Sequence, residues 1–570
     1  MSNTGAEVPN SSLKGNQKEA GGIDNVGPQS PISHHFEDVS SESSKERETD
    51  ASKGYIVGGS HVGKEDNPST GDYPVRQVDF DFPLTKFKKV VDQGHEYIVL
   101  DFVEGDRENP FNWPSKKKTY MSLILLAQTL FIGLGTTAYS SGINRMVKDL
   151  HRSTELGQLG LFCFNFACAL APLFLAPFCE LVGRRIIYSG AFILFMCTFI
   201  GLALGKNIAT ILVLRVLEGL FGCVGTILVG GTFSDMYESK DRAIPMAGFA
   251  FIAIFGTVAA PIYSGFIDQA LGWRWLEGIQ GMSNIPLAVL VTLTFQETRG
   301  GVYLKKRAQV LRAALGDQRI KSPMELESHD VKQMLHTSCV KAIKMLITEP
   351  VVLVFGLWIA FAWGITFLFL SVIPITFQEH HGWGEGVSGL PYISLCVGTT
   401  LGFAFNFLQI RKYKAVCREA GKGVPEARLY GAMIGGSMLP IGLFIYSFTQ
   451  YPFVHWIGPV IGLAPIAIGI FFIVESCYSY TSDCYGENSS SAIAGQGFFR
   501  NTLGAVTPLF ASQFFHNVHS QYAGLILALV ATILSLIPFV LFKYGPSLRA
   551  RSRLARVGQA AAEEKEQEGF

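Results

Sequence analysis

The sequence predicts an all-α integral membrane protein whose twelve transmembrane helices form two bundles of six. Three observations lead to this fold class. The 570-residue chain is 48% hydrophobic and only 16% charged, with a mean hydropathy of +0.28, whereas a soluble domain carries about 25% charged residues. Apolar runs long enough to cross the hydrocarbon core as helices recur twelve times along the chain. A long polar stretch between the sixth and seventh runs divides them into two equal sets.

Residues 1–110 are predicted to be a disordered cytoplasmic tail. Polar and small residues dominate this segment, with "SSESSKERETD" as the extreme case. Such a composition cannot bury enough apolar surface to offset the entropy lost on ordering. The N-terminus shows no apolar stretch of the kind found in a signal peptide. We therefore expect the first membrane helix to act as its own signal.

The first bundle is expected over residues 111–297. It begins after "ENPFNWPSKKK", where two proline dipeptides break the chain and three lysines precede the first apolar run. Its six helices are expected near 119–141, 156–181, 186–205, 207–233, 243–268 and 275–296. A cytoplasmic central loop over 298–348 then connects the two bundles.

The second bundle is expected over residues 349–545, followed by a cytoplasmic C-terminal tail over 546–570. Its six helices are expected near 350–377, 386–409, 429–450, 455–480, 490–515 and 521–544. "GTVAAP" in the fifth helix and "GAVTP" in the eleventh are weakly similar. Parallel six-helix repeats are one way in which transporters are built, so a duplicated unit is plausible.

The distribution of Lys and Arg among the loops orients the chain. With the N-terminus inside, the cytoplasmic loops contain Arg184, Arg185, Lys240, Arg242, Lys305, Lys306, Arg307, Arg312, Arg411, Lys412, Lys414 and Arg418. The opposite loops contain fewer basic residues, namely Arg145, Lys148, Arg152, Lys206 and Arg274. Cytoplasmic loops are typically enriched in Lys and Arg. This bias predicts that both termini are cytoplasmic.

Composition and motifs argue against several other classes of protein. The net charge of +1 gives no basic face for nucleic acid. The 10 cysteines lack the spacing of a disulfide framework or a zinc site. No phosphate-binding Walker motif and no set of nucleophile and base is visible. Adjacent histidines in "QEHHGWGE" (Glu379, His380, His381) do not share one ligand geometry, so we expect no metal site there. Together these observations predict a protein that has no cofactor and is not an enzyme.

The loop after the second helix, "LFLAPFCELVGRRII" (173–187), is unusually charged. Gly183 permits a tight turn, and Arg184 and Arg185 can anchor it at the lipid headgroups. Anchoring explains the arginines but not Glu180, because the macrodipole disfavours an acid at the C-terminal end of a helix.

"APFCELVGRR" resembles the cytoplasmic signature of the major facilitator superfamily in its fungal drug:proton antiporter form with twelve helices. In that family an acid and arginines form a latch that holds the cytoplasmic side closed. Leu181 stands where many members carry Arg. "SDMYESKDRA" (234–243) supplies the partners expected on the next loop. The resemblance therefore assigns a cytoplasmic gate to Glu180, Gly183, Arg184, Arg185, Asp235 and Arg242.

Other segments between residues 105 and 556 extend the resemblance. "LRVLEG" is similar to the fourth-helix motif with its membrane arginine, here Arg215. "GTVAAPIYSG" (256–265) resembles the fifth-helix antiport motif, with Ala260 and Ser264 in place of two glycines. "ENPFNW", "GWRW", "ETRGGVYLKKRA" and "FFRNTLGAVTPLF" resemble the polyamine and multidrug branch. The antiporter-like motif is thereby assigned to Gly256, Ala260, Pro261 and Gly265.

Four charged residues stand out inside the predicted helices, where each costs at least about 2.5–3.5 kcal/mol on insertion scales. Arg215 and Glu218 are three apart and share one helix face. Glu475 lies inside the tenth helix, and Arg500 lies roughly 16 Å along the eleventh. They could form two internal ion pairs, Arg215 with Glu218 and Glu475 with Arg500, that only fix helix register. The alternative hypothesis is proton coupling, in which an acid takes and releases the proton beside an arginine.

The substrate cavity is predicted at Gln128, Tyr139, Trp363 and Tyr478. Aromatic residues are dense in the seventh helix, "LWIAFAWGITFLF". For any single ring, packing in the core or against lipid is the favoured interpretation. As a set in a central cavity, they would suit flat or cationic organic compounds through stacking and cation–π contacts.

The resemblance implies a secondary transporter that couples export of small organic compounds to protons by alternating access. The expected compounds are drugs, polyamines, toxins or secondary metabolites, and the expected protein is a monomer in the plasma membrane. Proton-coupled uptake of a vitamin, organic acid or similar nutrient is the alternative. A membrane sensor would require a structured cytoplasmic tail, which the composition does not predict.

Overall fold

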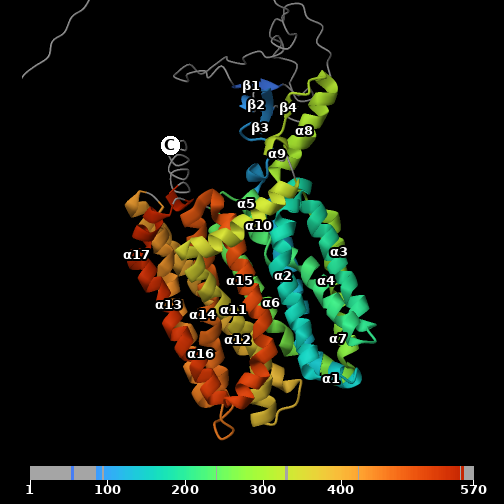
Figure 1. The fold of residues 1–570 in the computed structure, drawn as a ribbon, viewed down its shortest axis with the longest axis vertical. Helices are drawn as coiled ribbons and strands as arrows, with labels where there is room; N and C mark the ends of the chain where they lie inside the picture. The colour runs from blue at the N-terminus through green and yellow to red at the C-terminus, as the bar shows by residue number, and fades with distance from the viewer. Residues whose placement is uncertain are drawn as a thin grey trace, which may run out of the picture.

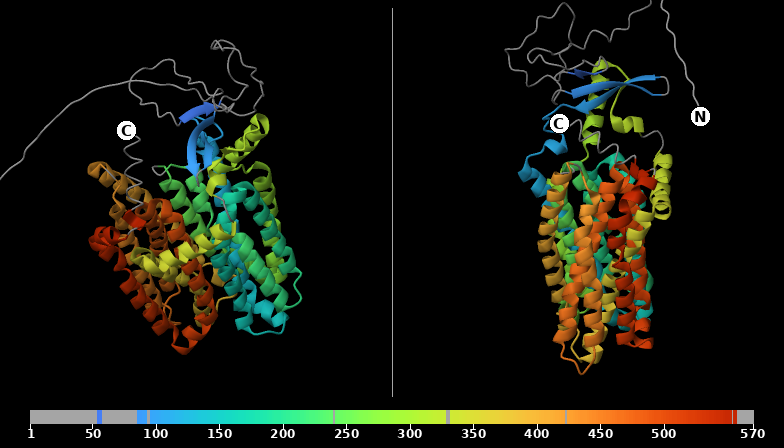
Figure 2. Two further views of the ribbon diagram at one scale, coloured as in Figure 1. Left: turned by 45° about the horizontal axis from the view of Figure 1, so that its top comes forward. Right: turned by 90° about the vertical axis from the view of Figure 1, so that its left-hand side faces the viewer.

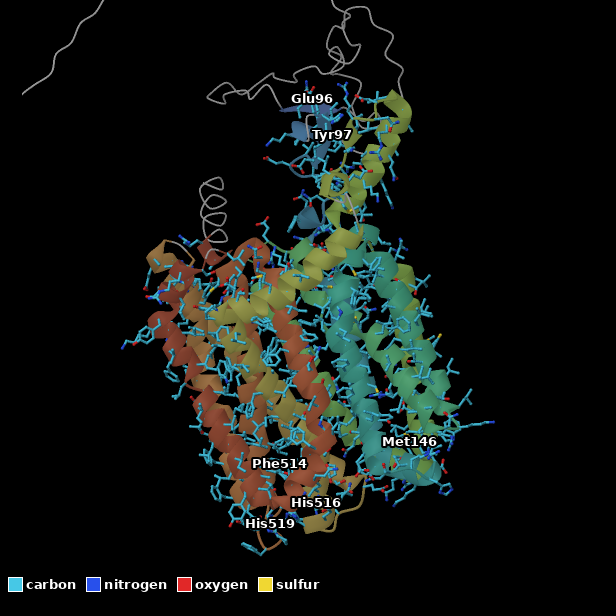
Figure 3. The ribbon with its side chains drawn as sticks, viewed as in Figure 1. Glu96, Tyr97, Met146, Phe514, His516 and His519 are labelled. Atoms are coloured by element: carbon cyan, nitrogen blue, oxygen red, sulfur yellow. The ribbon has the colours of Figure 1, made fainter. Side chains whose placement is uncertain are left out.

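The computed structural model describes residues 53–56, 85–92, 95–238, 241–327, 331–421, 423–552 and 554–556. Long helices run side by side, and a small sheet with one helix stands at one end of them (Figures 1 and 2). We call this the sheet end, and it is the side expected to be cytoplasmic. Glu96 and Tyr97 mark the sheet end, whereas Met146, Phe514, His516 and His519 lie at the opposite end (Figure 3), here called the far end.

The first half of the bundle contains six membrane spans. Its helices are α1 (Ser115–Asp149), α2 (Thr154–Val182), α3 (Arg184–Ala203), α4 (Ile208–Thr226), α5 (Val229–Met236), α6 (Ala243–Leu271) and α7 (Trp273–Thr294). α4 and α5 together make one span, Ile208–Met236. Asn207 begins it, because its side-chain oxygen accepts a hydrogen bond from the Thr210 amide over 2.8 Å.

The second half has the same order of spans. Its elements are α11 (Pro350–Pro374), η2 (Ile375–His380), η3 (Val387–Gly389), α12 (Tyr392–Ala420), η4 (Pro425–Arg428), α13 (Leu429–Thr449), α14 (Ile457–Tyr485), η5 (Gly486–Asn488), α15 (Ser489–Asn517), α16 (Ser520–Leu534) and α17 (Ile537–Arg551). α16 and α17 form one span. That span reaches residue 551, so its last turns extend into the predicted C-terminal tail, whose residues 557–570 lie outside the described part.

Eleven helices of the described chain are long and apolar enough to cross a membrane. The remaining expected helix, the eleventh at 490–515, falls on α15, which is 29 residues long and packs between α11 and α2. Its buried face carries polar groups such as Gln496, Arg500 and Asn501, which lower its apolar character. The all-α prediction with twelve membrane helices is confirmed.

Each half has its own buried apolar core, but α6 contributes to both. One core is drawn from residues between Trp113 and Phe295, nearly all of them in α1 to α7. The other is drawn from the elements α10 to α17 and from Ala250, Ile254 and Val258 of α6. The halves therefore meet along α6, which packs against α12, and along α2, which packs against α15.

The prediction that all of residues 1–110 are disordered is wrong for part of that segment. Strands β1 (Lys53–Ile56), β2 (Thr85–Asp92) and β3 (His95–Phe102) form a sheet with β4 (Ile320–Lys321) from the central loop, in the order β1-β2-β3-β4. β1 and β2, and β2 and β3, pair antiparallel, whereas β3 and β4 pair parallel with Ile98 opposite Ile320. Residues 1–52 and 57–84 lie outside the described part.

The partner that orders this segment comes from far along the chain. Phe87, Ile98 and Leu100 bury one face of the sheet against α8 (Gly300–Leu315), which contributes Leu304, Ala308 and Leu311. The segment predicted as a loop over 298–348 is thus largely helical, since α9 (Pro323–Glu327) and α10 (Val331–Thr348) follow β4. Local composition does not reveal a partner two hundred residues away. We call the unit of β1–β4 and α8 the sheet domain.

Candidate functional site

An ion-pair cluster joins three spans at the sheet end of the first half. The Arg184 guanidinium donates to Asp235 over 2.9 Å, and both side chains are nearly fully buried. Arg299, after the last span of this half, donates to the other carboxylate oxygen of Asp235 over 3.2 Å. One acid therefore ties the start of α3 and the segment after α7 to the end of α5.

A second acid holds the turn between α2 and α3. Gly183 has φ +104°, in the region that favours glycine. The Glu297 carboxylate accepts hydrogen bonds from the backbone amides of Arg184 over 2.9 Å and of Arg185 over 3.1 Å. A carboxylate at the first amides of α3 also has favourable charge for a helix N-terminus.

The predicted gate residues divide into two groups. Arg184 and Asp235 meet, whereas Glu180 and the Arg185 side chain are exposed, and the described residues give Glu180 no ion-pair partner. Arg242 is half-buried at the start of α6. Burial lowers the pKa of the Arg242 guanidinium, and the carboxylates of Asp235 and Asp483 oppose that shift.

The second half repeats this cluster, which the sequence reasoning missed. Arg428, just before α13, donates to Asp483 of α14 over 2.9 Å, and Tyr413 donates to the same oxygen over 2.9 Å. The Arg428 guanidinium lies 3.6 Å from the centre of the Tyr413 ring. Each pair links the start of the third span of its half to the end of the fourth. The sequence offers one indication of this repeat, because a basic loop follows both the second and the eighth helix.

In the first half, a buried ion pair lies inside the membrane region. Arg215 donates to Glu218 over 2.9 Å, and neither side chain is exposed to solvent. The remaining guanidinium nitrogens donate to the backbone oxygens of Thr136 over 3.0 Å and Gly160 over 3.4 Å. The guanidinium also stacks over Tyr139 at 4.2 Å. The predicted pairing of Arg215 with Glu218 is present; its part in proton coupling stays a prediction.

Arg500, in the second half, is buried without a carboxylate partner among the described residues. It donates to the Tyr478 hydroxyl over 2.9 Å and to the Asn501 side chain over 3.2 Å. Its guanidinium lies 4.5 Å from the centre of the Trp363 ring. Three neutral groups, two of them aromatic, therefore surround a buried cation.

The predicted pairing of Glu475 with Arg500 is wrong. Glu475 is buried on α14 and accepts a hydrogen bond from Ser479 over 2.8 Å. Glu475, Ser479 and Asp483 recur every four residues, so they share one helix face, and Asp483 places that face toward Arg428. Arg500 instead meets Tyr478. Two residues at a similar level in neighbouring helices can still point to different sides, and the sequence does not show which side of α14 a residue faces.

The antiporter-like motif lies where the first half meets its neighbours. A Cβ on Gly256 would stand 3.0 Å from the Leu130 carbonyl of α1, and one on Gly265 would stand 2.8 Å from the Glu385 carbonyl of the other half. Ala260 is fully buried. The Pro261 carbonyl lies against Gly389, where no side chain fits. The small residues thus permit close approach of α6 to both α1 and the second half.

Charged contacts join the halves at the far end. Arg145 of α1 pairs with Asp268 of α6 over 3.2 Å and with Glu385 of the second half over 2.8 Å. The Gly386 amide donates to the Gln269 side chain over 3.2 Å. Nearer the sheet end, the rings of Phe251 and Phe403 stack between α6 and α12 at 4.8 Å. The halves therefore touch toward both ends.

The sequence matches the profile of the Major Facilitator Superfamily over residues 125–507. The chain belongs to this superfamily. The match extends from α1 into α15 and so covers most of both halves.

Relatives in the superfamily cover most of the chain. A major facilitator superfamily multidrug transporter FLU1 of Candida albicans is 32% identical over 81% of this chain and 76% of its own length. An MFS-type efflux pump of Trichophyton rubrum, MFS2, is 31% identical over 81% of this chain and 78% of its own length. The multidrug transporter TPO1_1 of Candida glabrata is 32% identical over 79% of each chain.

Two of the predicted cavity residues of this superfamily member hold buried polar groups without protein partners. Gln128 is fully buried, and neither of its side-chain polar atoms has a partner among the described residues. The same holds for the Trp363 indole nitrogen. Tyr139 and Tyr478 are engaged, because Tyr139 donates to the Gly157 carbonyl over 3.0 Å and Tyr478 accepts from Arg500.

A cavity of about 230 Å³ lies at the far end of the second half, where Glu379, His380 and His516 contribute to its lining. His516 contacts Glu379 over 2.9 Å. Among the described residues, no group of three or more His, Cys, Asp or Glu side chains is placed to hold a metal ion.

Proposed function

We propose that this multi-pass membrane protein is a secondary transporter that exports small organic compounds in exchange for protons by alternating access. The observation that carries the proposal is the Arg215–Glu218 pair, which is fully buried inside a two-half bundle. Ionisable groups inside a membrane protein are expensive and commonly mark ion or proton pathways. The relatives named as multidrug transporters and as an efflux pump support export.

Alternating access requires contacts that break at one end while they hold at the other. At the far end, separation of Arg145 from Glu385 would release the two halves, because these side chains belong to different halves and are partly exposed. At the sheet end, the Arg184–Asp235 and Arg428–Asp483 pairs each lie within one half. They would keep each half rigid, so that the halves rock as bodies.

The substrate is proposed to bind between the halves, near Gln128, Tyr139, Trp363 and Tyr478. Buried polar groups nearly always have hydrogen-bond partners, so Gln128 and the Trp363 indole are available to a substrate. The rings near Arg215 and Arg500 would add stacking surface. We propose no cofactor, no catalysis and no nucleic acid partner for this cycle.

The proposed setting is a monomer in the plasma membrane with both termini in the cytoplasm. The proposed units are a tail over 1–110 that includes β1, β2 and β3, bundles over 111–297 and 349–545, a connecting segment over 298–348 and a tail over 546–570. The excess of Lys and Arg at the sheet end supports this orientation. An epitope inserted at Gly316, an exposed turn after α8, should be inaccessible to impermeant reagents in intact cells.

The test of function is accumulation of labelled compounds by the full chain in proteoliposomes. An antiporter drives its substrate into the acidic compartment, whatever the orientation of the protein in the vesicle. A symporter, the uptake alternative, drives substrate into the alkaline compartment. Accumulation that ignores the direction of the proton gradient would contradict proton coupling. Protein-free liposomes control for passive distribution of weak bases.

A further inference from the structure

A third acid lies buried in the first half, and the predicted coupling set does not include it. Glu277 of α7 is 4% exposed. It stands only four residues after Trp273, which begins α7 at the far end, so from the sequence it looks like a charge at a helix boundary. A rise of about 1.5 Å per residue places it roughly 6 Å along the helix.

Glu277 lies near the Arg215–Glu218 pair. Its neighbour Leu276 packs against Gly142 of α1, one turn from Tyr139, and the Arg215 guanidinium lies 4.2 Å from the centre of the Tyr139 ring. The charges of Glu218 and Arg215 influence Glu277, and the charge of Glu277 influences Tyr139 and Tyr263 of α6. Cys163 and Cys168, both on α2, are further titratable groups near this cluster. Groups from the packed helices α1, α2, α4, α6 and α7 therefore converge on one buried site.

The cluster has one more acid than it has cations. Arg215 is fully used: it pairs with one oxygen of Glu218, binds two backbone oxygens and stacks on Tyr139. The second oxygen of Glu218 is buried without a partner. Within the described residues, the Glu277 carboxylate has neither a hydrogen bond nor an ion pair. Two carboxylates that repel each other and share one guanidinium in a buried site cannot both stay charged at low cost.

We propose that Glu277 and Glu218 form a proton-binding pair that shares Arg215, and that Glu277 is the member nearer the far end. This inference rests on the proposed function. One proton from water at the far end adds to the Glu277 carboxylate. Its transfer to the unpartnered oxygen of Glu218 leaves Glu277 ionised and breaks no other bond. Arg215 then faces a neutral Glu218 and an ionised Glu277, so its charge is balanced before and after the transfer.

The first test measures the proton itself and needs no substrate. Infrared spectra of the purified full chain should show a protonated carboxyl C=O band near neutral pH that disappears as the pH is raised. We expect Glu277→Gln and Glu218→Gln each to remove this band. Glu155→Gln, which changes an exposed acid in the first turn of α2, should leave it in place. Persistence of the full band in Glu277→Gln would overturn the inference.

The second test uses ethidium, a flat organic cation, in proteoliposomes with a trapped pH indicator. Glu277→Gln should abolish gradient-driven accumulation, because a variant that cannot carry the proton cannot draw on the proton gradient. Ethidium counterflow without a gradient should persist, which also shows that the variant is folded. If the wild type moves no protons with any compound, the proposed function fails, while the infrared band still decides the inference. Wild-type coupling in Glu277→Gln would refute the inference alone.

Discussion

Replacement of Arg307 by Ala should detach the sheet domain strands from α8. Arg307 is 2% exposed and donates to Asp106 over 2.7 Å and to Glu108 over 2.5 Å. It also donates to the Thr85 hydroxyl over 3.3 Å. Removal of one partner from a buried ion pair typically costs about 3–5 kcal/mol, because the other charge stays buried and unpaired.

The assay is hydrogen exchange of the backbone amides of β3, measured by mass spectrometry on the full chain in nanodiscs. Each 1.4 kcal/mol changes an opening equilibrium tenfold, so the predicted cost corresponds to roughly a hundredfold or greater acceleration of exchange. Lys306→Ala is the matched control, because Lys306 is the exposed neighbour on the same helix. The double variant Asp106→Leu with Arg307→Met should recover part of the protection, since an apolar pair leaves no buried charge.

The result that would refute this reasoning is exchange of β3 in Arg307→Ala within about threefold of the wild type, a change of less than about 1 kcal/mol. In that case the apolar contacts of the sheet with α8 would hold the strands without the ion pairs. Equal acceleration in Lys306→Ala would also refute it, because the effect would then not come from the buried charges.

Three further predictions follow from the described contacts. Glu297→Ala should destabilise the start of α3 by about 1 kcal/mol, as loss of a helix cap does, and slow transport in the proteoliposome assay, whereas Glu180→Ala should change neither. Gly389→Ala should slow closure of the far end, because a methyl group would meet the Pro261 carbonyl; cross-linking rates between the halves would show this. Burial opposes ionisation of Glu325, but hydrogen bonds from α8 and from the neighbouring backbone outweigh it and lower its pKa. The stability that Glu325 adds is therefore present above its unfolded pKa of about 4.3 and is lost as the pH falls below it. Hydrogen exchange of α9 should show this pH dependence in the wild type and not in Glu325→Gln.

Local patterns were sufficient to locate the membrane helices and the contacts between near neighbours in sequence. Arg215 and Glu218 could be paired because three residues along a helix bring two side chains to one face. The fold class followed from apolar runs whose length matches the bilayer. These inferences need only the geometry of one helix.

Contacts between distant segments were not accessible in this way. Glu297 replaces Glu180 as the acid that holds the α2–α3 turn, and it stands more than a hundred residues away. Glu475 was assigned the wrong partner because the facing side of α14 depends on how α13 and α15 pack against it. Glu277 was missed because it stands two residues into the expected sixth helix, where a charge is ordinary, and its burial depends on how the helices pack. Each error concerns which helix faces are brought together, and that is decided by the whole bundle.

Because β3 pairs with β4, the folded unit that begins before the first bundle ends inside the segment that connects the two halves. A fragment that stops at residue 297 would lack β4 and α8 and would leave the apolar face of the N-terminal strands uncovered. A fragment that continues through Lys321 would retain both. If the two halves were expressed as separate chains, the cut that preserves each folded unit would therefore fall beyond Lys321. Deletion of the N-terminal strands would in turn expose the apolar face of α8, which belongs to the connection between the halves.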